Sequence, residues 1–364
     1  MDADRKVRFA EALAERKDWI LDYLTRDDRK SLFEPQDIHD AVYSYVTAGG
    51  KALRPCLLLL SCGAVGGEET DALPAALSVE LFHTWTMVHD DIMDRDELRR
   101  GQPTVHEDFR QRALKRLGYD QEEARHYGLS IGIMSAEVQH GWAISLLSEL
   151  YDAEKNNAPV VLNLIQHLET RILLALVGGQ TLDIQYSKVP VDALDEEDIL
   201  DVLWRKTGAL MQYSGSAGAM IGLNTPDLKH PLVEALSTFT SECGVAFQLK
   251  DDVLGIVGDE ASLGKPVGSD IREGKRTTVL SHAFGNASKT ERDYLLRVVG
   301  NQGATDSEVE DVKSLVQQLG GVRHTENLAA RRIEIALESL EILPGSEQKE
   351  LLAGWADYLV RRTF

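Results

Sequence analysis

Two aspartates that lie four residues apart, Asp90 and Asp94, end an apolar segment with helical character. On a helix, residues four apart project from one face, so their carboxylates would lie one turn above the other. Like charges placed in this way repel by roughly 0.2–0.5 kcal/mol. A divalent cation shared between them would reverse this penalty, and all-oxygen ligands favour Mg²⁺, Mn²⁺ or Ca²⁺ over zinc. The alternative is a solvated helix end whose acids pair with neighbouring arginines.

A second acidic pair, Asp251 and Asp252, repeats this arrangement after the apolar run VAFQL. Mg²⁺ usually takes one or two protein carboxylates and completes its shell with water and phosphate oxygens. Two acidic helix ends that face each other therefore predict a third participant, and a diphosphate fits this requirement. The repetition favours the metal interpretation over the solvated helix end.

Basic residues beside glycine supply the fixed positive charge that a diphosphate needs. They occur in the following segments: Gly49–Pro55, Arg99–Gly101, Lys206–Gly208, Gly264–Pro266 and Gly274–Thr278. Glycine lets the backbone approach an anion closely, arginine offers a planar fork to phosphate oxygens, and lysine acts as a point charge. Any one of them is also compatible with a helix end or a surface charge. Together with two acidic clusters, they indicate a site for two anionic substrates.

The composition limits the other functions. The 364 residues carry a formal net charge of −20, which argues against nucleic acid as a partner. No run of eighteen apolar residues predicts a membrane span, and the charged N-terminus lacks the apolar centre of a secretory signal, so we expect a cytoplasmic protein. Cys56, Cys62 and Cys243 have no CxxC spacing, which predicts core thiols and neither disulfides nor zinc.

The elements that must position these residues are helices. Four long segments lack the alternation of exposed strands, and they span residues 76–94, 169–187, 198–223 and 233–256. Asp198 and Thr225 are the N-caps that the pattern predicts. No repeat or linker divides the chain, so we expect one all-α domain over residues 1–364.

These motifs together resemble the trans-isoprenyl diphosphate synthases of the polyprenyl synthetase family. The resemblance runs from about residue 40 to 285 and rests on GGKALRP, His83, DDIMDRDELRRGQPTVH, GGQTLD, KTG, FQLKDD and GKPVGSDIREGKRT. It implies a single large helical bundle with a central cavity, a homodimer, and Mg²⁺ as cofactor, with three ions per active site and Mn²⁺ as a possible substitute. It further implies condensation of isopentenyl diphosphate with dimethylallyl, geranyl or farnesyl diphosphate.

The resemblance also assigns roles to individual residues. Asp90 and Asp94 would bind metal from one side with Asp91 in support, and Asp251 would bind it from the other side, with Asp252 acting through water. The allylic diphosphate would be held by Arg99, Lys206, Thr207, Gln248 and Lys265, with Lys275 close by. Isopentenyl diphosphate would be held by Lys51, Arg54, His83 and Arg100. Lys206 and Thr207 would sit at a helix break whose carbonyl groups face the developing carbocation.

Two positions bear on metal binding and product length. Gly255 stands where many family members carry a third aspartate in the second cluster, which predicts weaker metal affinity there. Trp85 lies five residues before Asp90, or about 7.5 Å along a helix, with Thr86 and Phe82 on the same segment. In the family, bulk at this position shortens the product, so Trp85 predicts geranylgeranyl (C20) before farnesyl (C15) diphosphate. The alternative is that Trp85 only packs the core.

Other functions remain open at this stage. A class I terpene cyclase also uses a metal-bound DDxxD motif but needs no site for a second substrate. A non-catalytic subunit of a prenyl synthase would tend to lose the acidic clusters, and a metal phosphohydrolase built on His89 and Asp90 would need further histidine ligands. For the homodimer, the run GSAGAMIG (215–222) offers small residues that permit close packing.

Overall fold

The protein is almost entirely helical. The structure is a computed structural model, and it describes residues 3–26, 29, 31–155, 157–190, 193–258 and 269–361. Its first helices are α1 (Ala3–Leu24), α3 (Gln36–Thr47), α4 (Leu53–Ala64), α5 (Leu73–Asp94), α6 (Val105–Arg112) and α7 (Gln121–Ser148). The middle of the chain forms α8 (Ala158–His167), α9 (Leu173–Tyr186), α10 (Glu196–Leu203), α11 (Ala209–Gly222) and α12 (Pro231–Val257). The C-terminal part adds α14 (Ser269–Glu273), α15 (Thr278–Asn286), α16 (Lys289–Val298), α17 (Asp306–Gln318), α18 (Gly321–Ser339) and α19 (Glu347–Arg361).

Short irregular elements interrupt or join these helices. A 3-10 turn covers Glu69–Ala72, and π-helical turns cover Ala113–Leu117, Leu168–Ile172 and Trp204–Gly208. The strands β1 (Leu98–Arg99) and β2 (Gln102–Pro103) pair as a small antiparallel hairpin directly after α5. The predicted all-α class is confirmed, and the helical pattern indicated neither this hairpin nor the π-helical turns.

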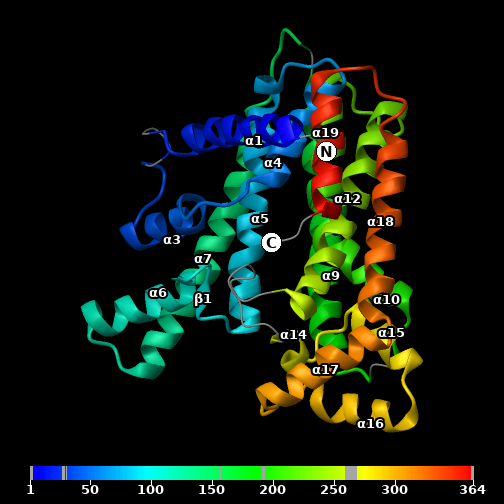
Figure 1. Ribbon diagram of the computed structural model, residues 1–364. Coiled ribbons are helices and arrows are strands. Elements are labelled where there is room, and N and C mark those ends of the chain that lie inside the picture. The colour runs from blue at the N-terminus through cyan, green and yellow to red at the C-terminus, as the bar shows by residue number, and fades with distance from the viewer. Residues whose placement is uncertain are drawn as a thin grey trace.

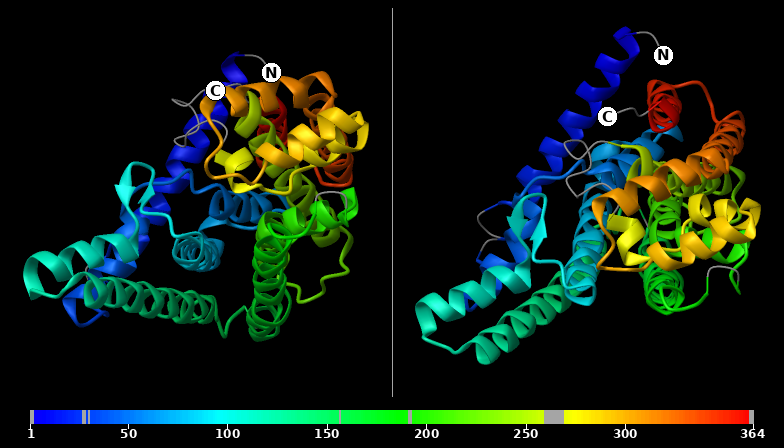
Figure 2. Two further views of the ribbon diagram at one scale, coloured as in Figure 1. Left: turned by 90° about the horizontal axis from the view of Figure 1, so that it is seen from below. Right: turned by 60° about the horizontal axis from the view of Figure 1, so that its bottom comes forward.

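The helices that carry the two acidic clusters, α5 and α12, are both packed within the helical bundle. Helix α5 packs on α4 and α7, α11 packs on α4 and α12, and α12 also packs on α18. Figure 1 shows α5, α12 and α18 running along the long axis of the molecule, and Figure 2 shows the layers end-on. One large hydrophobic core joins residues from α1 to α19, and a smaller one joins the end of α12 with α14–α17.

Small residues in α11 allow its close contact with two neighbours. A Cβ atom on Gly218 would lie 2.2 Å from the carbonyl oxygen of Leu58 in α4, and one on Gly215 would lie 2.3 Å from that of Leu236 in α12. The run 215–222 is therefore used for packing within the chain. A contact of this run with a second copy stays a prediction.

Both predicted N-caps are also wrong. Helix α10 begins three residues earlier than expected, because Asp195 caps it and Asp198 closes the capping box from the third position. Helix α12 begins at Pro231, with the ring of His230 accepting from the amide of Leu232. The hydroxyl of Thr225 instead accepts from the amide of Asp227 in the preceding turn.

One stretch, Ala158–Tyr186, is long and apolar enough to cross a membrane by length and composition, with a mean hydropathy of 1.5. Only 33% of that window is buried within the chain. The sequence criterion of eighteen consecutive apolar residues did not select it, because polar residues such as Asn163, His167 and Glu169 interrupt the run. An apolar face of α8 and α9 is thus left uncovered by the rest of the chain.

Candidate active site

The first acidic cluster lies where α5 stops and the chain turns back. Arg95 follows Asp94 in the left-handed conformation (φ 61°), and its amide donates to the carbonyl of Asp91. The hairpin then reverses at Arg100 and Gly101, both with positive φ, and places Arg99 beside the end of the helix. The reversal explains why so many charges of both signs are crowded into residues 90–100.

Asp91 is buried and its carboxylate is bonded on both oxygens. Arg99 Nε donates to Oδ1 at 2.7 Å and to Oδ2 at 2.9 Å, Arg99 Nη2 also donates to Oδ1, and Tyr45 donates its hydroxyl to Oδ2. The backbone amide of Val105 donates to the same tyrosine hydroxyl at 3.3 Å. Asp91 therefore fixes Arg99 and the hairpin. Tyr45, which lies on α3, was not found from the sequence.

Lys206 projects from the π-helical turn toward the first cluster. Its ammonium group lies 2.5 Å from Asp183 Oδ2 and 3.8 Å from Asp90 Oδ1. A Cβ atom on Gly179 would lie 2.6 Å from the Cβ of Arg205 and 3.0 Å from the amide nitrogen of Lys206, so glycine is needed for α9 to approach this turn. The expected helix break is a π-helical turn instead, a feature that is frequent at functional sites.

The next residue, Thr207, connects this turn to the second acidic cluster on α12. Its hydroxyl donates to Gln248 Oε1 at 3.2 Å, and Gln248 Nε2 lies 3.5 Å from Asp252 Oδ1. Lys275 Nζ lies 3.5 Å from the same oxygen. Lys206 contacts Asp90, and its chain neighbour Thr207 contacts Gln248 beside Asp252, so adjacent residues of the π-helical turn reach both acidic clusters.

Burial makes two of the carboxyl groups hard to ionise. Burial, together with the negative charge of Asp90, raises the pKa of Asp94 to about 6, although Lys206 opposes the shift. Burial also raises the pKa of Asp252 to about 6, against the opposing charge of Lys275. The Oδ2 atom of Asp252 is buried and has no hydrogen-bond partner among the described residues. A cation close to either group would favour its ionised form.

A basic cluster lies on the other side of the hairpin. Arg100 donates to the backbone carbonyl of Gly49, and a Cβ atom on Gly50 would lie 3.2 Å from Arg100 Nη1. Burial lowers the pKa of Arg54 to about 10, while Glu80 opposes this. Burial, reinforced by the charges of Arg54, Arg100 and Arg99, holds the pKa of His83 well below its usual value. In this basic cluster Arg54 and Arg100 carry the positive charge, and Glu80 is an acidic member that the sequence did not single out.

The remaining predicted residues are placed as follows. Lys51 is exposed just before α4, Asp251 is half-buried on α12, and Lys265 lies outside the described residues. Arg99, predicted to hold the allylic diphosphate, lies near the site with its guanidinium bonded to Asp91. The assignment of roles to individual residues remains a prediction.

The residues predicted to limit product length form an aromatic cluster. Trp85 is 8% exposed, and its ring centroid lies 5.0 Å from that of Phe82, 5.4 Å from that of His89 and 5.3 Å from that of His140. The indole nitrogen of Trp85 is buried without a partner in the described structure. His140 Nε2 lies 2.9 Å from Glu169 Oε1 in the π-helical turn after α8. Thr86, in contrast, uses its hydroxyl to donate to the carbonyl of His83.

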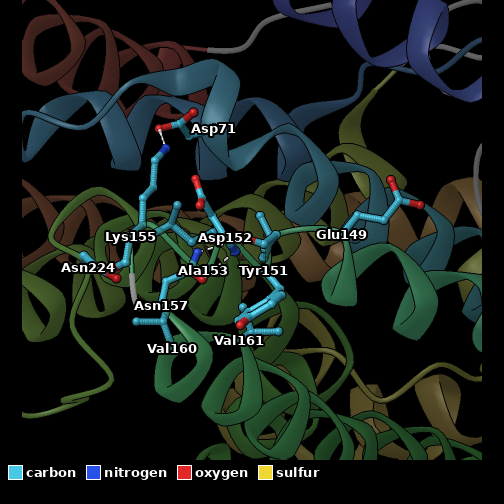
Figure 3. A pocket seen from close by; sticks show the side chains of 12 residues that line it. Asp71, Glu149, Tyr151, Asp152, Ala153, Lys155, Asn157, Val160, Val161 and Asn224 are labelled. Atoms are coloured by element: carbon cyan, nitrogen blue, oxygen red, sulfur yellow. Dashed lines mark hydrogen bonds and ion pairs between the residues drawn. The ribbon is translucent and has the colours of Figure 1, made fainter.

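A cavity of about 410 Å³ lies far from these groups (Figure 3). Its lining includes Asp71, Lys155 and Asn224, and Lys155 Nζ contacts Asp71 Oδ2 at 2.6 Å. Asp71 immediately precedes α5, whereas Asp90 lies near its other end, about 30 Å away at 1.5 Å per residue. This cavity therefore does not belong to the acidic site.

The described carboxylates do not form a metal site by themselves. Within the described ranges, no three His, Cys, Asp or Glu side chains converge closely enough to hold a metal ion. Mg²⁺ ordinarily completes its shell with water and substrate phosphates, so this arrangement suits a metal that arrives with a diphosphate. The buried, unpartnered Oδ2 of Asp252 fits an oxygen ligand of such an ion or of its water, and the metal-binding roles of Asp90, Asp94 and Asp251 remain predictions.

The family of this chain is identified by a match that covers most of its sequence. A sequence model described as polyprenyl synthetase matches residues 35–319. The chain belongs to the polyprenyl synthetase family. The match is longer than the segment of about 40–285 that carries the motifs, because α16 and α17 are included.

Members of this family and their solved structures align with this chain over nearly their whole length. The geranylgeranyl diphosphate synthase of Sulfolobus acidocaldarius is 32% identical, with 97% of each chain covered. The crystal structure of the geranylgeranyl pyrophosphate synthetase of Pyrococcus horikoshii superposes with a TM-score of 0.78 at 30% identity, covering 98% of this chain and 99% of that one. The geranylgeranyl pyrophosphate synthase of Corynebacterium glutamicum, crystallised with isoprenyl diphosphate and magnesium, has a TM-score of 0.80 at 27% identity, with 98% and 99% covered.

Proposed function

We propose that this prenyltransferase condenses isopentenyl diphosphate with an allylic diphosphate and releases geranylgeranyl diphosphate as its main product. Membership of the polyprenyl synthetase family establishes the reaction class. The observation that carries the proposal is that consecutive residues of one π-helical turn reach both clusters, Lys206 toward Asp90 and Thr207, through Gln248, toward Asp252. It supports one cationic site, flanked by two acidic helix ends, for a single diphosphate.

In this proposal each side of the site has a separate task. Asp90, Asp94 and Asp251 would hold Mg²⁺, and Lys206 and Lys275 would hold the allylic diphosphate. The bound metal would act as a Lewis acid that stabilises negative charge on the leaving diphosphate. The lysines add fixed positive charge that needs no rearrangement when the C–O bond breaks.

The second substrate would lie against the basic cluster of Arg54, His83 and Arg100, with Lys51 at its edge. Its double bond would attack the allylic carbocation, and a proton would then be lost. None of the motif side chains is an obvious base, so the departing diphosphate would accept this proton. A class I terpene cyclase would have no use for this basic cluster.

The cofactor is proposed to be Mg²⁺, with three ions per site and Mn²⁺ as a substitute. The magnesium and isoprenyl diphosphate in the Corynebacterium structure support a divalent metal in proteins of this fold. The phosphohydrolase alternative is disfavoured, because His89 packs against Trp85 and no group of three metal-ligating side chains forms around it among the described residues.

The assembly is proposed to be a homodimer in the cytoplasm. Exposed apolar side chains mark α8 and α9, with Leu162 67% exposed and Leu174 63% exposed, and Val177 and Ile184 continue this face. A second copy of the chain would cover it. Cys56, Cys62 and Cys243 are buried free thiols, which is the usual state in a reducing compartment.

The decisive experiment incubates the purified chain with Mg²⁺, isopentenyl diphosphate and each of dimethylallyl, geranyl or farnesyl diphosphate. The products are dephosphorylated and sized by chromatography. We expect consumption of isopentenyl diphosphate and a C20 alcohol. Cyclic products without such consumption would show a cyclase, and no turnover by the chain alone would indicate a non-catalytic subunit.

A further inference from the structure

Arg276 connects the turn that carries Lys275 to the chain just after α9, 87 positions earlier in the sequence. Its Nε and Nη2 atoms donate to the carbonyl oxygen of Val189 at 3.1 and 2.7 Å, and its Nη1 atom donates to the carbonyl oxygen of Gly274 at 2.6 Å. The side chain is half-buried. The basic segment 274–278 contains this arginine, but the family motifs assign it no role.

Val189 is a direct continuation of α9. The chain keeps turning beyond the helix through backbone hydrogen bonds of 3.0 to 3.2 Å, in which the amides of Ser187, Lys188 and Val189 donate to the carbonyl oxygens of Asp183, Gln185 and Tyr186. The same helix carries Asp183, whose Oδ2 atom lies 2.5 Å from the ammonium group of Lys206. Arg276 therefore ties its own turn to the helix that also holds Lys206.

The other side of this turn is fixed by a close approach of two backbone segments. Gly274 adopts a φ of 69°, and a Cβ atom there would lie 2.8 Å from Gly300 Cα. The amide of Gly300 donates to the carbonyl oxygen of Ile271 at 2.8 Å, and Ile271 is fully buried in the smaller core. These contacts hold the turn to the C-terminal part of the molecule, and Arg276 supplies its connection to α9.

We infer that Arg276 is a positioning residue for Lys275, and that it fixes the spacing between this lysine and Lys206. The inference rests on the proposed function, in which these two lysines hold the allylic diphosphate. A lysine ammonium is a point charge on a flexible four-carbon stem, so its placement depends on the backbone that carries it. Charges that are already in place stabilise a developing anion without rearrangement, which a lysine on a loose turn would not do.

The charges around Lys275 agree with a fixed place for its ammonium group. Its Nζ atom lies 3.5 Å from Asp252 Oδ1. Burial alone would lower the pKa of this lysine, but the negative charges of Asp252, Asp270 and Asp183 raise it. Asp183 thus acts on Lys275 as well as on Lys206, and a shift of the turn relative to α9 would change the first contact without changing the second.

Two other roles of Arg276 must be separated from this one. A guanidinium has five N–H donors, and the bonds to the two carbonyl oxygens use three of them, so the others could bind a diphosphate directly. Direct binding predicts a loss of affinity that does not depend on Lys275. A role in stability alone predicts a lower melting temperature and equal changes in the KM of both substrates.

The test combines steady-state kinetics, with each substrate varied in turn, and calorimetric binding of inorganic pyrophosphate in the presence of Mg²⁺. Arg276→Met keeps the length of the side chain and removes its donors. We expect the KM for geranyl diphosphate and the Kd for pyrophosphate to rise by about tenfold, because a misplaced group loses much of its effect. The KM for isopentenyl diphosphate is expected to stay unchanged, since its proposed site is the separate cluster of Arg54, His83 and Arg100. Arg276→Lys keeps the charge but lacks the planar fork, so it is expected to resemble Arg276→Met.

Arg272→Met is the matched control. Arg272 lies at the end of α14, and its Nε atom also donates to a distant backbone carbonyl, that of Ala304, at 3.3 Å. Its other partner is Asp306 at the start of α17, so these contacts do not involve α9. Loss of this side chain is expected to lower the melting temperature without raising the KM for geranyl diphosphate.

A double-mutant cycle with Lys275→Ala gives the sharpest separation. If Arg276 acts through Lys275, Arg276→Met is expected to change the Kd for pyrophosphate by less than about twofold in the Lys275→Ala background, because coupled residues are not additive. An additive loss in that background would overturn the inference in favour of direct binding. An unchanged KM for geranyl diphosphate in Arg276→Met, or a rise shared equally with Arg272→Met, would also overturn it and leave the proposed function intact. Failure of the natural protein both to convert geranyl diphosphate and to bind pyrophosphate would overturn both.

Discussion

Tyr45 donates its hydroxyl hydrogen to Asp91, although the two residues lie on different helices and 46 positions apart. The same hydroxyl accepts from the amide of Val105, the first residue of α6. Tyr45 thus joins α3 to α5 and α6 at the carboxylate that also orients Arg99. We regard it as a positioning residue for Arg99.

Replacing Tyr45 by phenylalanine removes this hydroxyl and leaves the ring. Arg99 then loses part of the support for its orientation, so the KM for the allylic diphosphate is expected to rise by about tenfold, the equivalent of about 1.4 kcal/mol. The KM for isopentenyl diphosphate and kcat are expected to change much less. Steady-state kinetics with each substrate varied in turn provide the measurement.

Tyr43→Phe is the control for this prediction. Tyr43 lies two residues before Tyr45 on α3, and its hydroxyl donates to the carbonyl of Leu24 at 3.2 Å. Its loss is expected to cost about 1 kcal/mol of stability without moving either KM. Equal effects of the two variants on the allylic KM would contradict the assigned role.

Gly179 is expected to tolerate no side chain, because α9 touches the π-helical turn at this point. Gly179→Ala would press on Arg205 and on the amide of Lys206, which moves Lys206 away from Asp90 and Asp183. We expect kcat to fall by at least about tenfold, in line with the loss of one well-placed charge. The neighbouring Gly178→Ala is the control, since its Cβ would meet only Arg205 Nη1, at 3.4 Å. Similar activity of the two variants would show that this contact is unimportant.

The sequence located the parts of the site that are fixed within one helix. The spacing of Asp90 and Asp94 is a local property, so it predicts that their side chains share one face of α5. The motif GGQTLD contains Asp183, but the motif alone predicts no role for this residue. Its ion pair with Lys206 depends on how α9 meets a π-helical turn that the sequence pattern did not indicate.

Contacts between distant elements could not be predicted from the sequence, because they depend on how the helices pack against one another. Tyr45 reaches Asp91 only through the packing of α3 near the end of α5, which no local periodicity encodes. The errors at Asp198 and Thr225 have another origin. Residues 195–198 offer four acidic side chains, and the capping box selects the first of them because Asp198 can then bond back to its amide.

The raised pKa values of Asp94 and Asp252 predict how pH affects the metal-free protein. A carboxyl whose pKa is about 6 in the folded state and near 4 when unfolded favours folding in its protonated form. Its stabilising effect is complete below pH 4 and is lost as the pH rises through 6. The melting temperature in chelator is therefore expected to fall between pH 5 and pH 7, and Mg²⁺ with pyrophosphate is expected to remove much of this fall.

Asp252→Asn isolates the contribution of one group. The asparagine cannot ionise, so this variant is expected to match the natural protein below pH 4, to exceed it increasingly as the pH rises, and to exceed it at pH 7 by on the order of 2 kcal/mol. Thermal unfolding at several pH values in chelator measures the difference. Parallel curves for the two proteins would mean that Asp252 does not titrate in this window.

Trp85 is expected to set the length of the product. It closes the space beside α5 together with Phe82 and His140, so Trp85→Ala would open a path along the helix toward Phe82. The main product is expected to lengthen from C20 by at least one five-carbon unit. Trp142→Ala serves as the control, because it removes another buried tryptophan at a similar cost of about 3–5 kcal/mol. An unchanged product profile in Trp85→Ala would leave Trp85 with a packing role only.

The uncovered apolar face of α8 and α9 is expected to hold two copies together. Leu174→Glu places a charge at its centre, and burying an unpaired carboxylate between two chains is strongly unfavourable. Size-exclusion chromatography with light scattering is expected to show a dimer for the natural protein and monomer for this variant at micromolar concentration. Leu296→Glu is the matched control, since Leu296 is 55% exposed on α16, away from this face. A monomeric natural protein, or a Leu174→Glu variant that remains dimeric, would remove α8 and α9 as the interface.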